Sequence, residues 1–217
     1  MARRTFIAAL LVAAALALTA CGDDDDDGGE EASGLPEGCR EAEAPPAKDQ
    51  QFERSGQRLE NSASAVVTTN CGSFTIELDT ARAPKTTASF AGLVEQGLYD
   101  ETLIHRIEPG FVVQGGDPLG DGTGGPGYFV DEPPPQDLTY TRGVVAMAKT
   151  AAEPPGRSGS QFFVVTAPAD AGLPPDYALL GRVSEGIETI ERIEGLVGPD
   201  GQQSGNAVIQ AITLEEG

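Results

Sequence analysis

The chain has 217 residues, with 14 lysines and arginines against 34 aspartates and glutamates, and a formal net charge of −20. This acidic excess excludes a protein that binds nucleic acid through clustered basic residues, and one that adheres electrostatically to anionic lipid. His105 is the only histidine, so a hydrolase built on a serine or cysteine with histidine would have to use it. A lone histidine is more often structural than catalytic, and the case for a metal site built on one histidine and dispersed acids is weaker still, so we expect no metal.

Residues 1–20 have the pattern of a secretory signal. Two arginines precede the apolar run Phe6–Leu18, which is too short for a comfortable membrane span, and small residues follow it. The end of this region, Leu18–Cys21, resembles the bacterial lipobox, which implies cleavage before Cys21 and lipid attachment to its sulfur. The alternatives are an uncleaved anchor helix and a secreted protein without lipid. We expect an extracytoplasmic protein anchored to the cell membrane through Cys21.

Residues 21–63 form an acidic segment rich in glycine and proline, with the unbroken run Asp23–Asp27. The segment has few large apolar residues, so it cannot bury enough surface to offset the entropy of ordering it. Calcium loops wrap their ligands around the ion with a turn that usually contains glycine, and no glycine interrupts this run. The composition predicts an extended, self-repelling tether.

Three cysteines have to be assigned. If Cys21 carries lipid, Cys39 and Cys71 remain as a pair in an oxidising compartment, and a disulfide between them is the natural hypothesis. Two free thiols are the alternative, because spacing alone does not exclude them.

Residues 64–217 hold enough chain for one domain with its own core. Helices are predicted from Pro84 to Gly97, where proline suits a first turn and glycine a stop, and around Ile187, Ile190 and Ile193. Alternating apolar residues bounded by glycine or proline predict strands at 65–69, 74–78, 103–107, 111–114, 144–148, 162–166, 178–183 and 208–214. Short strands with only two helices favour a barrel or a sandwich.

A glycine-rich loop, Gly120–Gly127, lies between two of these strands. A phosphate-binding loop needs a following helix, usually with a lysine or serine after the last glycine, whereas Tyr128–Val130 has the character of a strand. We therefore expect a loop that passes close to a binding groove.

Two motifs stand in a fixed order along the chain. Ile104–Asp117 places Arg106, Phe111 and Gln114 around a proline-glycine turn, and Gly159–Val165 follows later. Together they resemble the two signatures of cyclophilin-type peptidyl-prolyl isomerases. Over about residues 65–214 the resemblance implies a mainly β fold: a closed eight-stranded antiparallel barrel capped by two α-helices.

The resemblance also implies a site. Arg106, Phe111 and Gln114 would be catalytic, and His105, next to Arg106 on a strand, would face away and be structural. The substrate-binding positions would be Val112, Ala148, Lys149, Phe163, Leu173 and Tyr177. Ala148 and Lys149 correspond to positions that bind the residue before proline through main-chain contacts. From sequence alone, core is more likely than pocket for Phe111, Val112, Phe162 and Phe163. Phe162 is expected to be core, because it alternates with Phe163 along a strand.

Prolyl isomerisation requires stabilisation of a twisted amide and needs no nucleophile or cofactor. A guanidinium from Arg106 could donate to the proline nitrogen as its lone pair leaves conjugation. We expect a monomer acting on proline-containing, unfolded or flexible exported polypeptides; the alternative is a binding module of the same fold without catalysis. Gly172 stands where many relatives have the tryptophan associated with cyclosporin binding, so weak cyclosporin sensitivity is expected.

Overall fold

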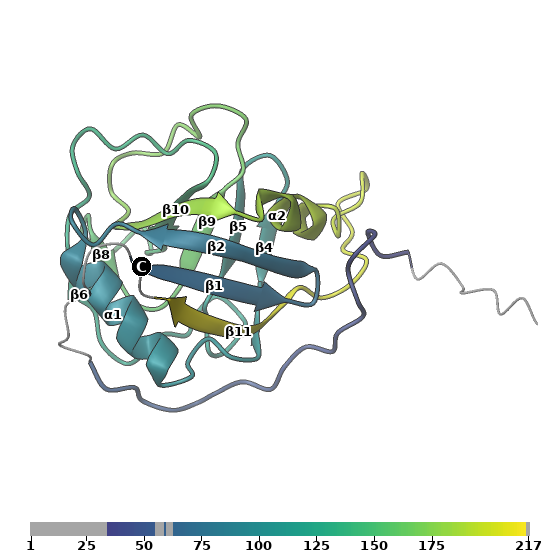
Figure 1. Cartoon of the computed structure of the whole chain (residues 1–217), viewed down its shortest axis with the longest axis horizontal. Coiled ribbons are helices and arrows are strands. Elements are labelled where there is room, and N and C mark those ends of the chain that lie inside the picture. Colours follow the sequence, from purple (N-terminus) through teal and green to yellow (C-terminus); the bar gives the residue numbers. More distant parts are fainter. Residues whose placement is uncertain (1–33, 55–58, 60–62, 216–217) are drawn as a thin grey trace, which may run out of the picture. The chain divides into compact units, whose positions relative to one another are not determined.

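The computed structural model describes residues 34–54, 59 and 63–215, which belong to the larger of two units, residues 32–217. The predicted signal, Cys21 and the acidic run Asp23–Asp27 lie outside the described residues. These described residues form a curled antiparallel sheet with two helices (Figure 1).

The helices are α1 (Pro84–Glu95) and α2 (Ile187–Glu194). The strands are β1 (Ser64–Thr69), β2 (Gly72–Leu78), β3 (Thr102–Leu103), β4 (Arg106–Glu108), β5 (Val112–Gly115), β6 (Val130–Asp131), β7 (Val144–Met147), β8 (Arg157–Ser158), β9 (Phe162–Val165), β10 (Leu179–Glu185) and β11 (Val208–Glu215). The elements predicted from the sequence are present, with shifts of a few residues at their ends. β6 and β8 pair with each other as a small separate ribbon.

The main sheet has the order β3-β11-β1-β2-β10-β7-β9-β5-β4, and all its pairs are antiparallel. The prediction of a closed, eight-stranded barrel was wrong in both respects, because the single strand expected at 103–107 is divided. Its first part, β3, pairs with β11, and its second part, β4, pairs with β5. Ile104 and His105 separate these two edge strands, so the sheet curls round without a ladder to close it.

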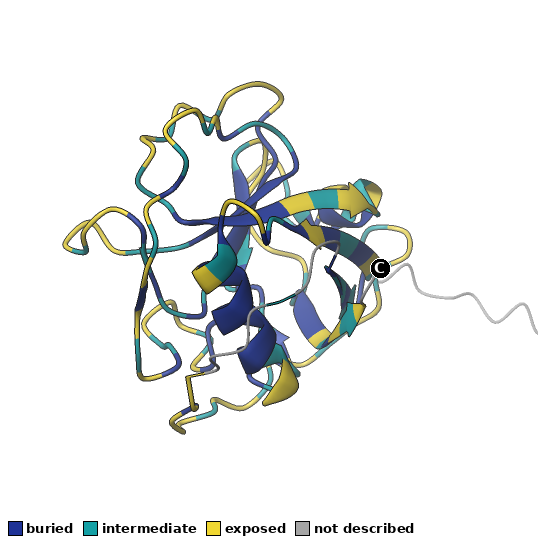
Figure 2. Ribbon diagram, turned by 60° about the vertical axis from the view of Figure 1, so that its left-hand side comes forward, coloured by how far each residue is buried: buried dark blue, intermediate teal, exposed yellow. Residues whose placement is uncertain are grey.

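Two apolar clusters occupy opposite faces of the central strands, because side chains alternate along a strand. In β9, Phe162 and Val164 join the main core, whereas Phe163 and Val165 join a second cluster on the other face. β7 and β9 are therefore buried along their whole length, whereas exposed residues concentrate in the loops (Figure 2). Helices α1 and α2 pack on the main core through Phe90, Leu93, Ile190 and Ile193.

Residues 34–54, which we call the strap, pack along the domain instead of forming the extended tether expected of them. Cys39 is bonded to Cys71 with an S–S distance of 2.04 Å. The Arg40 amide donates to the Asn70 carbonyl at 2.9 Å, and the Phe52 side chain is 8% exposed within the main core. The segment is poor in apolar residues, so one disulfide, one buried ring, main-chain hydrogen bonds and side-chain hydrogen bonds such as those of Lys48 hold the strap in place.

Candidate active site

The β4–β5 hairpin aims the side chains of the first motif. Arg106 lies directly opposite Gln114, so both point to the same face of the sheet. The turn between the strands needs Gly110, whose φ of 73° is in the left-handed region. The Phe111 amide donates to the Glu108 carbonyl at 3.0 Å, and the Gly110 amide donates to Glu194 Oε1 of α2 at 2.7 Å. The second helix thereby holds the turn in place.

Arg106 is fixed by three neighbours. Its Nη1 donates to Gln114 Oε1 at 3.2 Å, and its Cζ lies 5.8 Å from the centroid of the Phe111 ring. Its Nε and Nη2 donate to Glu108 Oε1 at 2.9 and 2.7 Å. The side chain is 43% exposed, so a ligand can reach the guanidinium. Glu108, which was not predicted from the sequence, binds the Nε–Nη2 edge of the guanidinium. The second N–H groups of Nη1 and Nη2 remain available to a ligand.

A chain of amides sets the orientation of Gln114. Gln161 Nε2 donates to the carbonyls of Gly122 and Gly124 at 3.0 and 2.9 Å, so its Oε1 must face Gln114. Gln114 Nε2 donates to that oxygen at 3.0 Å, which leaves Gln114 Oε1 directed at Arg106. Gln161 was not among the predicted site residues, although it stands inside the second motif.

His105 contacts Gln114, although the strand predicted at 103–107 would have turned it away from the site. Its Nε2 lies 3.4 Å from Gln114 Nε2, so the pair is compatible only with an unprotonated His105 Nε2 that accepts from the amide. Burial lowers the pKa of His105 despite the nearby Asp117 carboxylate, which favours the neutral ring. The residue thus serves as a support for Gln114.

The second cluster assembles nearly all the predicted apolar positions. Val112 and Phe163 are buried in it, at 2% and 4% exposure, and its partly buried members include Phe111, Ala148, Leu173 and Tyr177. The rings of Phe163 and Tyr177 meet edge to face, with centroids 5.4 Å apart. Phe162 lies in the main core, as expected for its position beside Phe163.

Tyr140 organises this cluster and was not found from the sequence. Its side chain is fully buried, and its hydroxyl donates to the Tyr177 carbonyl at 2.7 Å and accepts from the Tyr177 amide at 3.1 Å. Burial raises the pKa of Tyr140 to about 12, so the hydroxyl keeps its proton at all physiological pH values. A tyrosine in an irregular segment gives no periodic signal that would mark it as buried.

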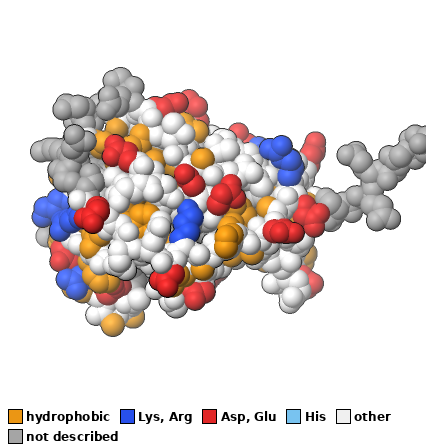
Figure 3. All heavy atoms as spheres, turned by 90° about the horizontal axis from the view of Figure 1, so that it is seen from below, with side chains coloured by type: hydrophobic (Ala, Val, Ile, Leu, Met, Phe, Trp, Pro, Cys, Tyr) orange, Lys and Arg blue, Asp and Glu red, His pale blue; other side chains and the backbone are white. Residues whose placement is uncertain are grey.

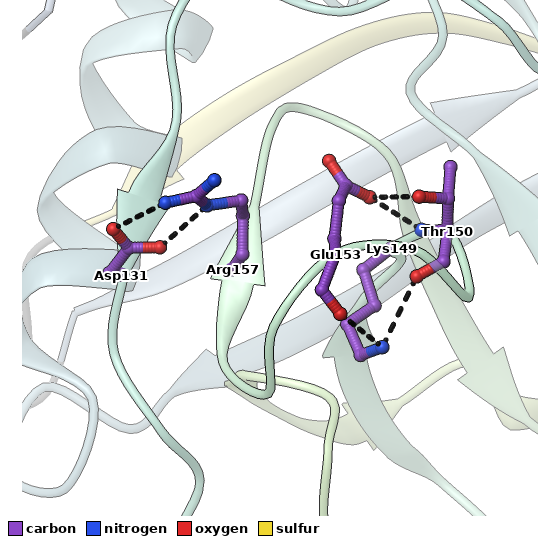
Figure 4. Close-up of polar contacts among 5 residues, drawn as sticks. All are labelled: Asp131, Lys149, Thr150, Glu153 and Arg157. Carbon is purple, nitrogen blue, oxygen red and sulfur yellow. Dashed lines mark hydrogen bonds and ion pairs between the residues drawn. The ribbon is translucent and has the colours of Figure 1, made fainter.

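A groove of about 720 Å³ adjoins these residues and is lined by Gln114, Ala148, Lys149 and Gln161 together with the glycine-rich loop. Its volume falls within the usual range for ligand sites. Lys149 Nζ lies 5.6 Å from the centroid of the Tyr177 ring and donates to the Thr150 and Glu153 carbonyls at 3.2 and 3.0 Å (Figure 4). Lys149 therefore connects the groove to the second cluster.

None of the helices in the described residues is long and apolar enough to cross a membrane.

Comparison with known proteins gives one consistent result. Residues 64–214 match the family described as "Cyclophilin type peptidyl-prolyl cis-trans isomerase/CLD". The chain is 39% identical to peptidyl-prolyl cis-trans isomerase-like 1 of Aspergillus oryzae over 156 residues, which cover 69% of this chain and 94% of that protein. It is 37% identical to the probable peptidyl-prolyl cis-trans isomerase B of Mycobacterium leprae, covering 70% of this chain and 57% of that protein.

A solved structure agrees with these relatives. The cyclophilin-type isomerase of Cryptosporidium parvum, determined in the presence of the dipeptide Ala-Pro, is 30% identical, with a TM-score of 0.64 over 71% of this chain and 99% of that one. The two motifs, the curled sheet with its two helices and these matches agree: the chain belongs to the cyclophilin-type peptidyl-prolyl cis-trans isomerases.

Proposed function

We propose that this protein is a lipid-anchored isomerase outside the cytoplasm, which interconverts cis and trans X-Pro bonds in exported polypeptides. The signal-like residues 1–20 and the lipobox-like Cys21 support this location. The Cys39–Cys71 disulfide supports it as well, because such bonds persist in oxidising compartments. Its substrates would be unfolded or flexible chains that contain proline, consistent with the Ala-Pro dipeptide in whose presence the Cryptosporidium relative was determined.

The proposed mechanism rests on Arg106. The barrier to rotation is the partial double bond of the amide, and twisting that bond returns the lone pair to the proline nitrogen. A guanidinium hydrogen bond to this nitrogen exists only in the twisted state, so it lowers the barrier without tightening the ground state. The observation that carries the proposal is the placement of Arg106 against Phe111 and Gln114, with its charge fixed and half exposed.

The required energy is within reach of this arrangement. Uncatalysed isomerisation takes tens of seconds, so about 1000 turnovers per second would require removing roughly 6 kcal/mol from the barrier. One preorganised charged donor supplies about 3 to 4 kcal/mol. Desolvation of the proline ring against Phe111 and Phe163, with a partly twisted bound conformation, would supply the remainder.

The test compares Arg106→Ala with Arg82→Ala in a prolyl-peptide isomerisation assay. Arg82 is a matched control, because it is 51% exposed and pairs with Asp79 at 2.7 Å, much as Arg106 pairs with Glu108 at 2.7 Å. We expect kcat/KM to fall about 100-fold or more in Arg106→Ala and to stay within about twofold in Arg82→Ala. Full activity in Arg106→Ala would overturn the mechanism, and a parent protein that binds the peptide without turning it over would favour the binding module.

A further inference from the structure

The groove beside the candidate active site has a wall that does not come from the family's domain. Lys48, Asp49, Gln50 and Gln51 of the strap line the same groove as Gln114, Ala148 and Lys149. The family match begins only at residue 64. The strap therefore adds a surface to the site that the isomerase domain alone would lack.

The strap is fixed on both sides of this wall. The Lys48 amide donates to the Pro118 carbonyl at 2.7 Å, and the Phe52 amide donates to the Pro126 carbonyl at 3.1 Å. Both acceptors belong to the loop that forms the floor of the groove. Phe52 is buried in the main core, so displacing the strap would expose an aromatic ring.

Lys48 provides the second anchor. Its Nζ donates to the carbonyls of Gly97 and Leu98 at 2.9 and 3.2 Å, and also to the Asp100 carbonyl, just beyond the end of α1. The ammonium group thus satisfies three main-chain acceptors in the turn that follows the helix. Burial lowers the pKa of Lys48, although the nearby acidic residues Asp100 and Glu101 oppose the effect.

The glycine-rich loop is shaped to receive the strap. Gly127 has φ of +90°, and a Cβ added there would overlap the side-chain amide of Gln51. The Gln51 side chain can lie this close to the loop because residue 127 has no side chain. Gln51 thus packs directly against the floor of the groove.

Hydrogen bonds and one cation–π contact hold the other side chains that line the groove, among them Thr150, Glu153 and Phe129 (Figure 4). Glu153 Oε2 accepts from the Thr150 amide at 2.5 Å and from Thr150 Oγ1 at 2.8 Å. Arg157 donates to Asp131 through two hydrogen bonds of 2.8 and 3.0 Å, and its Cζ lies 5.5 Å from the centroid of the Phe129 ring. Phe129 lines the groove and is 54% exposed, which offers an apolar surface to a bound chain.

Asp49 is the carboxylate that this groove offers to a ligand. Glu153 is engaged by Thr150, and the ammonium groups of Lys48 and Lys149 are engaged by carbonyls. Asp49 is exposed and has no hydrogen bond or ion pair with any other residue in the described ranges. Figure 3 views the face along which the strap runs and shows acidic groups spread over it, with basic groups only at separate positions. Lys48, Lys149 and Glu153 balance to one positive charge within the groove, and the exposed Asp49 carboxylate is the charged group there that a basic side chain could pair with.

We propose that the strap forms a binding wall for substrate residues on the amino-terminal side of the isomerised proline, and that Asp49 selects lysine or arginine there. This inference rests on the proposed function, in which Ala148 and Lys149 bind the residue directly before proline. The strap and these two residues line one groove, so a chain that leaves them through the groove would pass the strap a few residues before proline. The enzyme would then prefer clients with a basic residue just upstream of proline.

The test uses three peptides that differ only in having lysine, glutamine or glutamate at the third position before proline. For the full chain we expect kcat/KM to favour lysine over glutamate by about two- to fivefold, and the ratio to shrink in high salt. Asp49→Asn should remove most of this preference and Asp49→Lys should reverse it. Glu43→Lys is the matched control, because Glu43 is an exposed strap residue that does not line the groove, and it should keep the preference.

Peptide affinity, measured by fluorescence anisotropy, separates this inference from the proposed function. A parent protein that binds the lysine peptide more tightly but does not isomerise it would refute the proposed function and support the strap wall. Equal affinity and equal kcat/KM for the lysine and glutamate peptides would overturn the strap wall, as would an equal loss of preference in Asp49→Asn and Glu43→Lys.

Discussion

The disulfide between Cys39 and Cys71 should make a large contribution to stability, because it connects the strap to the β1–β2 turn across 32 positions of sequence. Closing a loop of this length removes conformational freedom from the unfolded chain, with a calculated stabilisation of roughly 3 to 4 kcal/mol. Single domains have a total stability of about 5 to 15 kcal/mol, so the bond would supply a substantial share. The perturbation is Cys39→Ser, which removes the bond at its half-buried end and leaves Cys71 in the core.

The assay is urea unfolding of oxidised protein and of Cys39→Ser, both in a Cys21→Ser background so that no other thiol interferes. With an unfolding slope of about 2 kcal/mol per molar urea, the midpoint should fall by about 1.5 to 2 M. Reductant should produce the same shift in the oxidised protein and none in Cys39→Ser. A midpoint change below about 0.3 M would refute the reasoning, because the bond would then not constrain the unfolded chain. Activity of the folded variant should persist, since neither cysteine lines the groove.

Three further predictions concern the site and the anchor. Burial lowers the pKa of His105, so the free energy of unfolding should be constant above about pH 6.5, fall as the pH drops below that value, and level off below the folded-state pKa. His105→Gln should abolish this pH dependence in denaturant titrations between pH 5 and 8. If the dependence persists in the variant, it comes from another group. Tyr140→Phe leaves the carbonyl and amide of Tyr177 without their partner. We therefore expect the free energy of unfolding, measured with denaturant, to fall by about 1 to 3 kcal/mol, and KM to rise. Unchanged values would show that water replaces the hydroxyl. Mass spectrometry of the mature protein should find a lipidated amino terminus at Cys21, and Cys21→Ser should move the protein from the membrane fraction to the soluble one; an unmodified Cys21 would refute the anchor.

The elements with a regular apolar pattern could be predicted from the sequence. The alternation in β9 placed Phe162 and Phe163 on opposite faces, and the structure puts them in different clusters. The spacing of Arg106 and Gln114 around a proline-glycine turn predicted a hairpin, and the two residues are cross-strand neighbours. In both cases the information is local, because strand periodicity and turn chemistry act over a few residues.

Features set by distant parts of the chain could not be predicted in this way. The division between β3 and β4 depends on pairing with β11, including a hydrogen bond from the Ile104 amide to the Ala207 carbonyl at 2.8 Å. The packing of the strap depends on a disulfide and on Phe52, neither of which changes the average composition of that segment. Glu108 was missed for a different reason: a carboxylate on an exposed strand is ordinary until its contact with the arginine is known.

The most direct test of the arginine mechanism is the rate of cis–trans exchange on the bound peptide, measured by NMR at saturating enzyme. This experiment separates the rotation step from binding and release. We predict that Arg106→Ala lowers the bound exchange rate by about 100- to 1000-fold while the peptide Kd changes only a few-fold, since the hydrogen bond forms only in the twisted state. A bound exchange rate equal to that of the parent would contradict the account.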